Sequence, residues 1–104
     1  MAPGEENPLP LLRVRGPSMA PTLRSGDIVL VNSARHPQEG DLVLVRWTTR
    51  PDQLSIKRAV HPVGDLWYVL GDNQFGSTDS RTLGPAEVLK VVRWRVWPRP
   101  KRLR

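Results

Sequence analysis

Residues 25–31 read SGDIVLV, and residues 39–45 repeat the pattern as EGDLVLV. A shorter echo of the same pattern, VGDL, occupies residues 63–66. Glycine and aspartate are typical of tight turns, and the run of β-branched and other apolar residues that follows each pair is typical of a strand. The repeat therefore predicts repeated entry into β-strands rather than a repeated functional site.

The segments around this repeat extend the pattern to most of the chain. Strands are predicted over residues 11–15, 27–32, 41–48, 54–60, 66–70 and 87–96, and short helical turns over residues 21–23 and 85–87. In the last strand, Val92 and Trp94 alternate with Arg93 and Arg95, which favours a Trp94 that faces the core. We therefore expect an all-β (β-dominated) fold, either a small folded sheet or a partly open barrel.

Length and composition set the domain organisation. The 104 residues predict one domain with a thin core. Hydrophobic residues make up 38% of the chain, and proline and glycine together number 19, which favours short strands joined by many turns. We expect a disordered lead-in over residues 1–10, a single domain over residues 11–97, and a basic tail over residues 98–104 that is extended or disordered.

The residue content excludes several kinds of site. The chain has no cysteine, so disulfides and thiolate metal sites are excluded. His36 and His61 each precede a proline and have no partner at ligand spacing, so we expect no metal and no cofactor. No apolar run approaches the roughly 20 residues of a membrane span, and the acidic N-terminus is not a secretory signal. We therefore expect a cytoplasmic protein without a transmembrane segment.

The net charge of +6 is concentrated near the C-terminus. Residues 90–104 contain seven lysines and arginines and no acidic residue, and the rest of the chain, with nine basic and ten acidic residues, is close to neutral. Such a basic tail can contact nucleic acid, an anionic membrane surface or an acidic partner. A solvated terminus without any partner explains the same charge equally well.

Ser18 lies between Pro17 and Pro21 in the sequence GPSMAPTL, residues 16–23. The two prolines exclude a continuous helix or strand, so the hydroxyl is predicted to lie on a stiff turn. A fixed hydroxyl suits a nucleophile, although a proline-rich surface turn produces the same pattern.

A serine nucleophile needs a base, and Lys57 is the best-placed lysine. It lies within the predicted strand over residues 54–60, where it shares a face with Ser55 and Ala59. Burial in a water-poor slot would lower the pKa of its amine, whereas a surface strand would leave the lysine solvated. His36 and His61 are the alternative bases, and both lie beside prolines in turn-like segments.

Four motifs together resemble the signal peptidase I family of serine–lysine proteases. Residues 18–23, SMAPTL, match its nucleophile motif, and GDIV at residues 26–29 matches the segment that follows. Residues 56–60, IKRAV, match its lysine motif, and GDN at 71–73 with STDSR at 77–81 matches its last motif. The resemblance covers residues 13–90 and implies a serine endopeptidase with a β-rich catalytic core.

The resemblance implies a catalytic dyad. Ser18 would be the nucleophile, and Lys57, neutral when active, would be the general base and later the general acid. The backbone amide of Ser18 would supply an oxyanion donor, because Gly16 has no hydroxyl and Pro17 has no amide. The substrate would bind in an extended form, as an added strand near the Ser18 segment.

The resemblance also implies a set of supporting residues. Ser77 would hydrogen-bond the lysine amine, and Asp79 and Arg81 would form a bracing ion pair beneath the site. The other supporting positions stand at the start of the same loop: Gly71, Asp72 and Asn73.

A short chain without an anchor is similar to the nickel-type superoxide dismutase maturation proteases. This likeness implies a cytoplasmic enzyme that removes the N-terminal leader of the dismutase precursor. Two alternatives stay open. One is a signal peptidase at a membrane surface, attracted through its basic tail to anionic lipid. The other is a non-catalytic β-module that binds peptide or nucleic acid through Trp94, Trp97 and the tail arginines.

Overall fold

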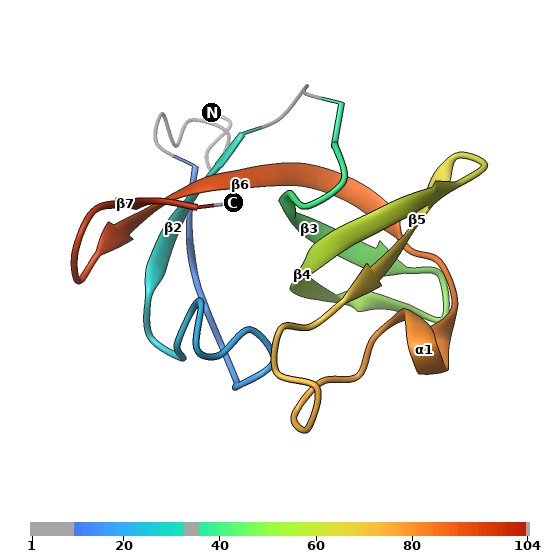
Figure 1. Ribbon diagram of the computed structural model, residues 1–104, viewed down its shortest axis with the longest axis horizontal. Helices are drawn as coiled ribbons and strands as arrows, with labels where there is room; N and C mark the ends of the chain where they lie inside the picture. Colours follow the sequence, from blue (N-terminus) through green and yellow to red (C-terminus); the bar gives the residue numbers. More distant parts are fainter. Residues whose placement is uncertain (1–9, 33–35, 104) are drawn as a thin grey trace.

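The computed structural model describes residues 10–32 and 36–103 as one antiparallel sheet with one short helix (Figure 1). The strands are β1 (Leu11–Arg13), β2 (Ile28–Asn32), β3 (Leu42–Trp47), β4 (Arg50–Val63), β5 (Leu66–Leu70), β6 (Glu87–Trp97) and β7 (Lys101–Arg102), and the helix is α1 (Ser80–Leu83). The strand order is β1-β2-β6-β3-β4-β5, with β7 paired to β6. The predicted β-dominated fold is confirmed, and it is an open folded sheet.

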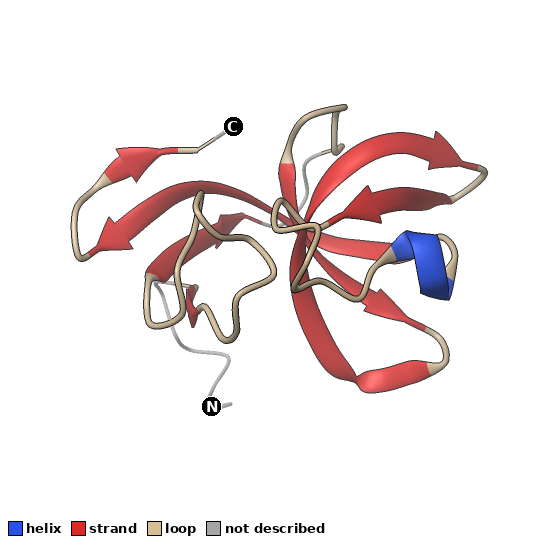
Figure 2. Cartoon of the chain, turned by 60° about the horizontal axis from the view of Figure 1, so that its bottom comes forward, coloured by secondary structure: helices blue, strands red, loops and turns tan. Residues whose placement is uncertain are grey.

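Strand β6 joins the two halves of this sheet. Residues 87–92 of β6 pair with β3, and residues 91–97 pair with β2. The long strand curves over the molecule, so that β1 and β2 lie on one side and β3, β4 and β5 on the other (Figure 2). Ser18 follows β1 in the first half, and Lys57 lies on β4 in the second half.

Two clusters of buried side chains form the core. The first contains Val14, Met19, Leu23, Val29, Val31, Leu42, Leu44, Ile56, Val92 and Leu103, and the second contains Val43, Val45, Trp47, Ala59, Val69, Ala86 and Val91. Strand β3 contributes alternate residues to both clusters, because successive side chains point to opposite faces of a sheet. Lys57 pairs with Val43 and therefore faces the second cluster.

The predicted burial of Trp94 is wrong, because its side chain is 39% exposed. A β-bulge explains the difference. Leu30 pairs with Trp94 whereas Val31 pairs with Val92, so Arg93 is an extra residue in β6. After this extra residue, the alternation of buried and exposed side chains along β6 is shifted by one position, so the Trp94 ring lies on the outer face of the strand.

The helix and β4 also differ from the prediction. Strand β4 extends beyond residues 54–60 in both directions. The predicted helical turn over residues 85–87 is wrong, because Ala86 already bridges to Trp67 at the entry to β6. The helix forms earlier, at Ser80–Leu83, where the Asp79 side chain caps it by accepting a hydrogen bond from Arg81 N.

The segment predicted as a basic tail, residues 98–104, bends after β6 and folds back onto it where the structure describes it. Lys101–Arg102 forms β7, and Leu103 is 3% exposed within the first cluster. The predicted lead-in over residues 1–10 lies outside the described residues except for Pro10, whose carbonyl accepts a hydrogen bond from Val31 N. Within residues 10–32 and 36–103, no helix is long and apolar enough to cross a membrane.

Candidate active site

The turn that carries Ser18 is anchored by two buried side chains. Met19 and Leu23 are 1% and 0% exposed and pack in the first core cluster. Two backbone hydrogen bonds close the turn around these side chains. Leu23 N donates to Met19 O at 2.9 Å, and Ala20 N donates to Pro17 O at 3.0 Å. Ser18 therefore lies half-buried on a fixed turn.

The loop at residues 71–73 ties this turn to the other half of the sheet. Asn73 N donates to Ser18 O at 2.9 Å, and Asn73 Nδ2 donates to Pro17 O at 3.0 Å. Asp72 N donates to the Met19 sulfur at 3.4 Å. The backbone at Ser18 is therefore held in register with the half of the sheet that carries Lys57.

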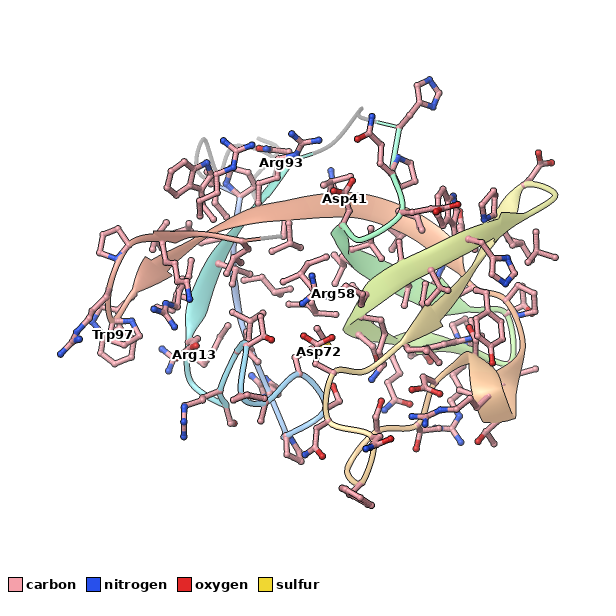
Figure 3. All side chains as sticks on the ribbon, in the orientation of Figure 1. Arg13, Asp41, Arg58, Asp72, Arg93 and Trp97 are labelled. Atoms are coloured by element: carbon pink, nitrogen blue, oxygen red, sulfur yellow. The ribbon has the colours of Figure 1, made fainter. Side chains whose placement is uncertain are left out.

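An ion pair between Arg58 and Asp72 strengthens this connection. Arg58 donates to the Asp72 carboxylate from Nη2 at 2.6 Å and from Nε at 3.1 Å, and Thr22 Oγ1 donates to it at 2.6 Å. Burial of Asp72 opposes its ionisation, but the hydrogen bonds from Arg58 and Thr22 outweigh burial and lower its pKa. Figure 3 shows Arg58 and Asp72 facing each other at the centre of the molecule, between the two halves.

Lys57 is buried, although lysine almost always keeps its amine in water. Its side chain is 3% exposed, and its Nζ donates to Ser77 Oγ at 3.3 Å. Burial lowers the pKa of Lys57 from its ordinary value of 10.5, and the charge of Asp79 opposes this shift only in part. The neutral amine is therefore reached at lower pH than for an exposed lysine.

Asp79 anchors the residues behind Lys57, and its side chain is 1% exposed. Its carboxylate accepts hydrogen bonds from Ser77 Oγ at 3.1 Å, from Gly71 N at 2.9 Å and from Arg81 Nη2 at 2.9 Å. Burial alone would raise the pKa of Asp79, but the hydrogen bonds from Arg81, Gly71 and Ser77 outweigh it and lower the pKa to about 2. The carboxylate is therefore ionised at neutral pH.

Gly71 is needed because two segments approach each other closely at this point. A Cβ atom on residue 71 would lie 2.0 Å from Ser77 Oγ and 2.7 Å from Ser18 O. Contacts this short do not occur between unbonded atoms in proteins, so any side chain here would push the Ser18 turn and Ser77 apart. The glycine therefore permits the spacing on which the candidate site depends.

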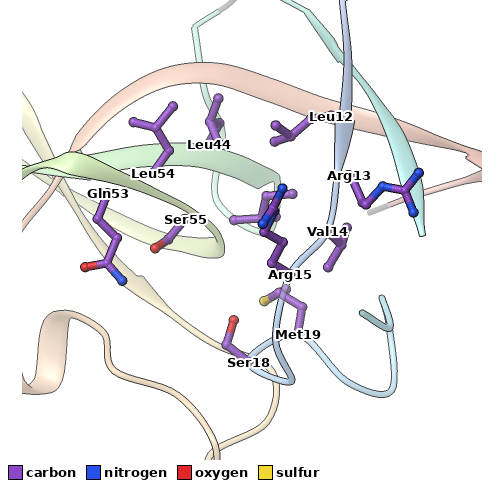
Figure 4. Close-up of a pocket in the computed structure, with 11 residues that line it drawn as sticks. Leu12, Arg13, Val14, Arg15, Ser18, Met19, Leu44, Gln53, Leu54 and Ser55 are labelled. Carbon is purple, nitrogen blue, oxygen red and sulfur yellow. The ribbon is translucent and has the colours of Figure 1, made fainter. Parts of the chain in front are cut away.

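Two adjoining cavities open beside Ser18. One, of about 190 Å³, is lined by both Ser18 and Lys57. The other, of about 350 Å³, lies between the β1 and β4 segments and forms a groove lined by both apolar and polar side chains (Figure 4). Ser18 and Lys57 both line the smaller cavity, and no hydrogen bond joins Ser18 Oγ to Lys57 Nζ.

Three residues that line both cavities were not singled out as site residues from the sequence: Arg15, Gln53 and Ser55. The alternation of side chains along β4 places Ser55 on the same face as Lys57, so the sequence contains a signal that could have identified Ser55 as a site residue. The sequence contains no such signal for Arg15 and Gln53, because they become neighbours of Ser18 only when the β1 and β4 segments come to face each other.

The structure keeps the alternative bases away from Ser18. The His61 ring stacks on Tyr68 with centroids 5.2 Å apart, and neither His61 nor His36 lines either cavity. In the part of the chain that the structure describes, no three histidine, aspartate or glutamate side chains gather as candidate metal ligands. The groups beside Ser18 that can exchange protons are hydroxyls and the Lys57 amine.

A serine hydroxyl and a buried amine in one cavity, next to a groove between strands, are features of a peptidase. Residues 3–91 match the family model described as Peptidase S24-like. Mitochondrial ATP-independent inner membrane protease subunit 1b of Arabidopsis thaliana is 34% identical, covering 80% of this chain and 67% of the relative. Mitochondrial inner membrane protease subunit 1 of Homo sapiens is 31% identical, covering 80% of this chain and 66% of the relative.

The chain therefore belongs to the Peptidase S24-like family. It is a peptidase, and the predicted likeness to signal peptidase I proteases is confirmed. It spans about two thirds of the length of both relatives.

Proposed function

We propose that this peptidase is a serine endopeptidase in which Ser18 is the nucleophile and Lys57 the general base, and that it removes an N-terminal leader from a precursor protein. The observation that carries the proposal is the cavity lined by Ser18 and by the 3% exposed Lys57. A lysine acts as a base only where its surroundings favour the neutral amine. Burial acts in that direction here, since it lowers the pKa of Lys57 from its ordinary value.

In the acylation step, Ser18 Oγ attacks the carbonyl carbon of the scissile bond, and its proton passes to neutral Lys57 Nζ. The tetrahedral oxyanion accepts a hydrogen bond from Ser18 N, which donates to no other group in the described part of the chain. The C–N bond then breaks, and the leaving amine takes the proton from Lys57. An ester on Ser18 Oγ remains.

In the deacylation step, a water molecule attacks the ester carbon and gives a proton to Lys57 Nζ. The C–O bond to Ser18 breaks, and the proton returns from Lys57 to Ser18 Oγ. Both steps need the amine in one position, and the hydrogen bond to Ser77, itself bonded to Asp79, supplies that position.

An extended leader can bind between two strand edges. Among the described strands, β1 is an edge strand of the sheet: one of its edges pairs with β2, and the other pairs with no described strand. Strand β5 pairs with β4 only from Arg58 onward, so residues 50–57 leave one edge without a partner among the described strands. Residues of both segments line the larger cavity beside Ser18, which favours binding of the leader as an added strand.

The substrate that we propose is the precursor of a nickel-type superoxide dismutase, processed in the cytoplasm. The motifs at residues 18–23, 56–60 and 71–81 support leader removal, and the likeness to the short maturation proteases described above is the support for this particular substrate. The experiment is incubation of the precursor with the protein, followed by mass spectrometry of the new N-terminus. Cleavage by the wild type and a loss of at least about 10³-fold in Ser18→Ala are expected.

Thr49→Ala, which removes an exposed hydroxyl outside both cavities, is the matched control and should cleave like the wild type. Undiminished cleavage by Ser18→Ala would refute the serine mechanism. Cleavage of other leaders but not of the dismutase precursor would reject this substrate and leave the mechanism standing.

A second candidate, a signal peptidase acting at a membrane surface, is favoured by the outer face of the C-terminal hairpin. Trp97, Trp94 and Val96 are 55%, 39% and 36% exposed. Lys101 and Arg102 are exposed on the adjoining strand, and the Arg102 guanidinium lies 5.9 Å from the centroid of a Trp94 ring. Exposed indole rings beside cations suit the boundary of an anionic bilayer.

This second candidate predicts flotation of the protein with phosphatidylglycerol vesicles and not with phosphatidylcholine vesicles. The double variant Trp97→Ala/Arg102→Ala should lose the binding, and added salt should weaken it. If the wild type stays at the bottom of the gradient with both kinds of vesicle, the membrane-surface candidate is removed.

A further inference from the structure

Arg15 occupies a position in the groove that the proposed catalytic steps do not use. It follows β1, lies three residues before Ser18, and lines both cavities. Figure 4 shows its side chain reaching into the groove, whereas the guanidinium of Arg13 points away from it. A peptide bound beside Ser18 would therefore pass within reach of the Arg15 guanidinium.

The groove carries positive charge without a balancing carboxylate. None of the residues that line the two cavities is an aspartate or a glutamate, whereas Arg15 and Arg50 are both among them. Within the described residues, the ion pairs involve Arg46, Arg58, Arg81 and Arg95, and none involves Arg15. The guanidinium of Arg15 is therefore available to a charged group that enters the groove.

The surroundings of Arg15 strengthen its attraction for a carboxylate. Beside Arg15, six apolar residues line the larger cavity: Leu12, Val14, Met19, Leu44, Leu54 and Ile56. When a peptide fills this space it displaces water, and a charge-assisted hydrogen bond gains strength as water is excluded. The planar guanidinium matches a carboxylate in two parallel hydrogen bonds.

We propose that Arg15 is a specificity-determining residue, which selects leaders that carry aspartate or glutamate in the segment occupying the groove. The proposal rests on the peptidase function proposed above, since the groove is a substrate site only if Ser18 is the nucleophile. The apolar walls bind neighbouring side chains of the leader, and Arg15 discriminates by charge. A leader without an acid in this segment should be cleaved about tenfold less efficiently.

The test is an exchange of charge between enzyme and peptide. Peptides based on one cleaved leader carry Asp, Asn or Lys at each groove position in turn, and kcat/KM is measured for the wild type, Arg15→Glu and Arg99→Glu. The wild type should prefer Asp over Asn by about tenfold, and Arg15→Glu should reverse the order and prefer Lys. Arg99→Glu makes the same change of charge at a residue that lines neither cavity, so it should behave like the wild type.

The same peptides are also bound to Ser18→Ala, and to Ser18→Ala combined with Arg15→Glu, with fluorescence anisotropy as the readout. This measurement reports selection without turnover, so it separates a failure of the Arg15 proposal from a failure of the peptidase mechanism. An acid preference that disappears with Arg15→Glu supports the proposal. Equal cleavage and equal affinity of the Asp and Asn peptides, or an Asp preference that persists in Arg15→Glu, overturns it.

Discussion

Replacing Lys57 with methionine is expected to lower kcat for leader cleavage by about 10³-fold or more, because general-base catalysis is lost. Methionine resembles the lysine side chain in length but has no amine, so Ser18 would keep its position and lose its proton acceptor. The measurement is kcat with substrate well above KM, compared with Lys90→Met as a matched substitution outside both cavities. Retained activity in Lys57→Met would contradict the proposed dyad.

Lys57→Met is expected to lower activity without lowering the stability of the protein at neutral pH. Burial lowers the pKa of Lys57 below 10.5, so the folded protein binds fewer protons than the unfolded chain in the pH range between the two pKa values. Stability of the wild type therefore falls as the pH decreases through that range. Lys57→Met removes this dependence and should be at least as stable as the wild type at neutral pH, which thermal unfolding across pH would measure.

Removal of the Asp79 carboxylate is expected to cause the largest loss of stability. Asp79→Ala leaves the Gly71 amide and Ser77 without their acceptor, and we expect a loss of about 3 kcal/mol in the free energy of unfolding. Cleavage should also fall, because Ser77 no longer has a fixed orientation behind Lys57. Urea unfolding at neutral pH measures the first effect, and the leader-cleavage assay measures the second.

The pH dependence gives an independent check on Asp79. Its pKa is lowered from 3.8 to about 2, so its contribution of about 2 kcal/mol is fully present above pH 4 and is lost as the pH falls through 2. Asp79→Ala should lack this acid transition. Glu87→Ala removes an ion pair with Arg46 whose side chains are 47% and 41% exposed, and this control should cost less than about 1 kcal/mol. Equal losses from the two variants would contradict the role of Asp79.

The sequence anticipates the parts of the fold that depend on local pattern. The apolar runs after the glycine–aspartate turns become β2 and β3, and strict alternation places Lys57 on the same face as Ala59, as the structure has it. The grouping of Ser18, Lys57 and Ser77 came from the motif resemblance, since no pattern within one strand can bring together segments separated by dozens of residues.

The features that the sequence does not reveal depend on pairing between distant strands. The bulge at Arg93 arises from the register of β6 on β2, so alternation alone misplaces Trp94. The same holds for Arg15, whose place in the groove depends on the β1 and β4 segments facing each other. The helix at Ser80–Leu83 has a local sequence signal, because the Asp79 side chain caps it. Pro85 is a more obvious signal for the start of a helix, and it favours the helical turn that was predicted over residues 85–87.

The hydroxyl group of Ser77 has a fixed polarity. Ionised Asp79 can only accept hydrogen bonds, so the Ser77 proton must point toward it, and only lone pairs of Ser77 Oγ face Lys57. The amine therefore gives a hydrogen to Ser77 and can never receive one from it. Its own lone pair is turned away from Ser77 and stays vacant for an incoming proton. Asp79, which lines neither cavity, thus sets the direction from which the Lys57 amine can accept a proton.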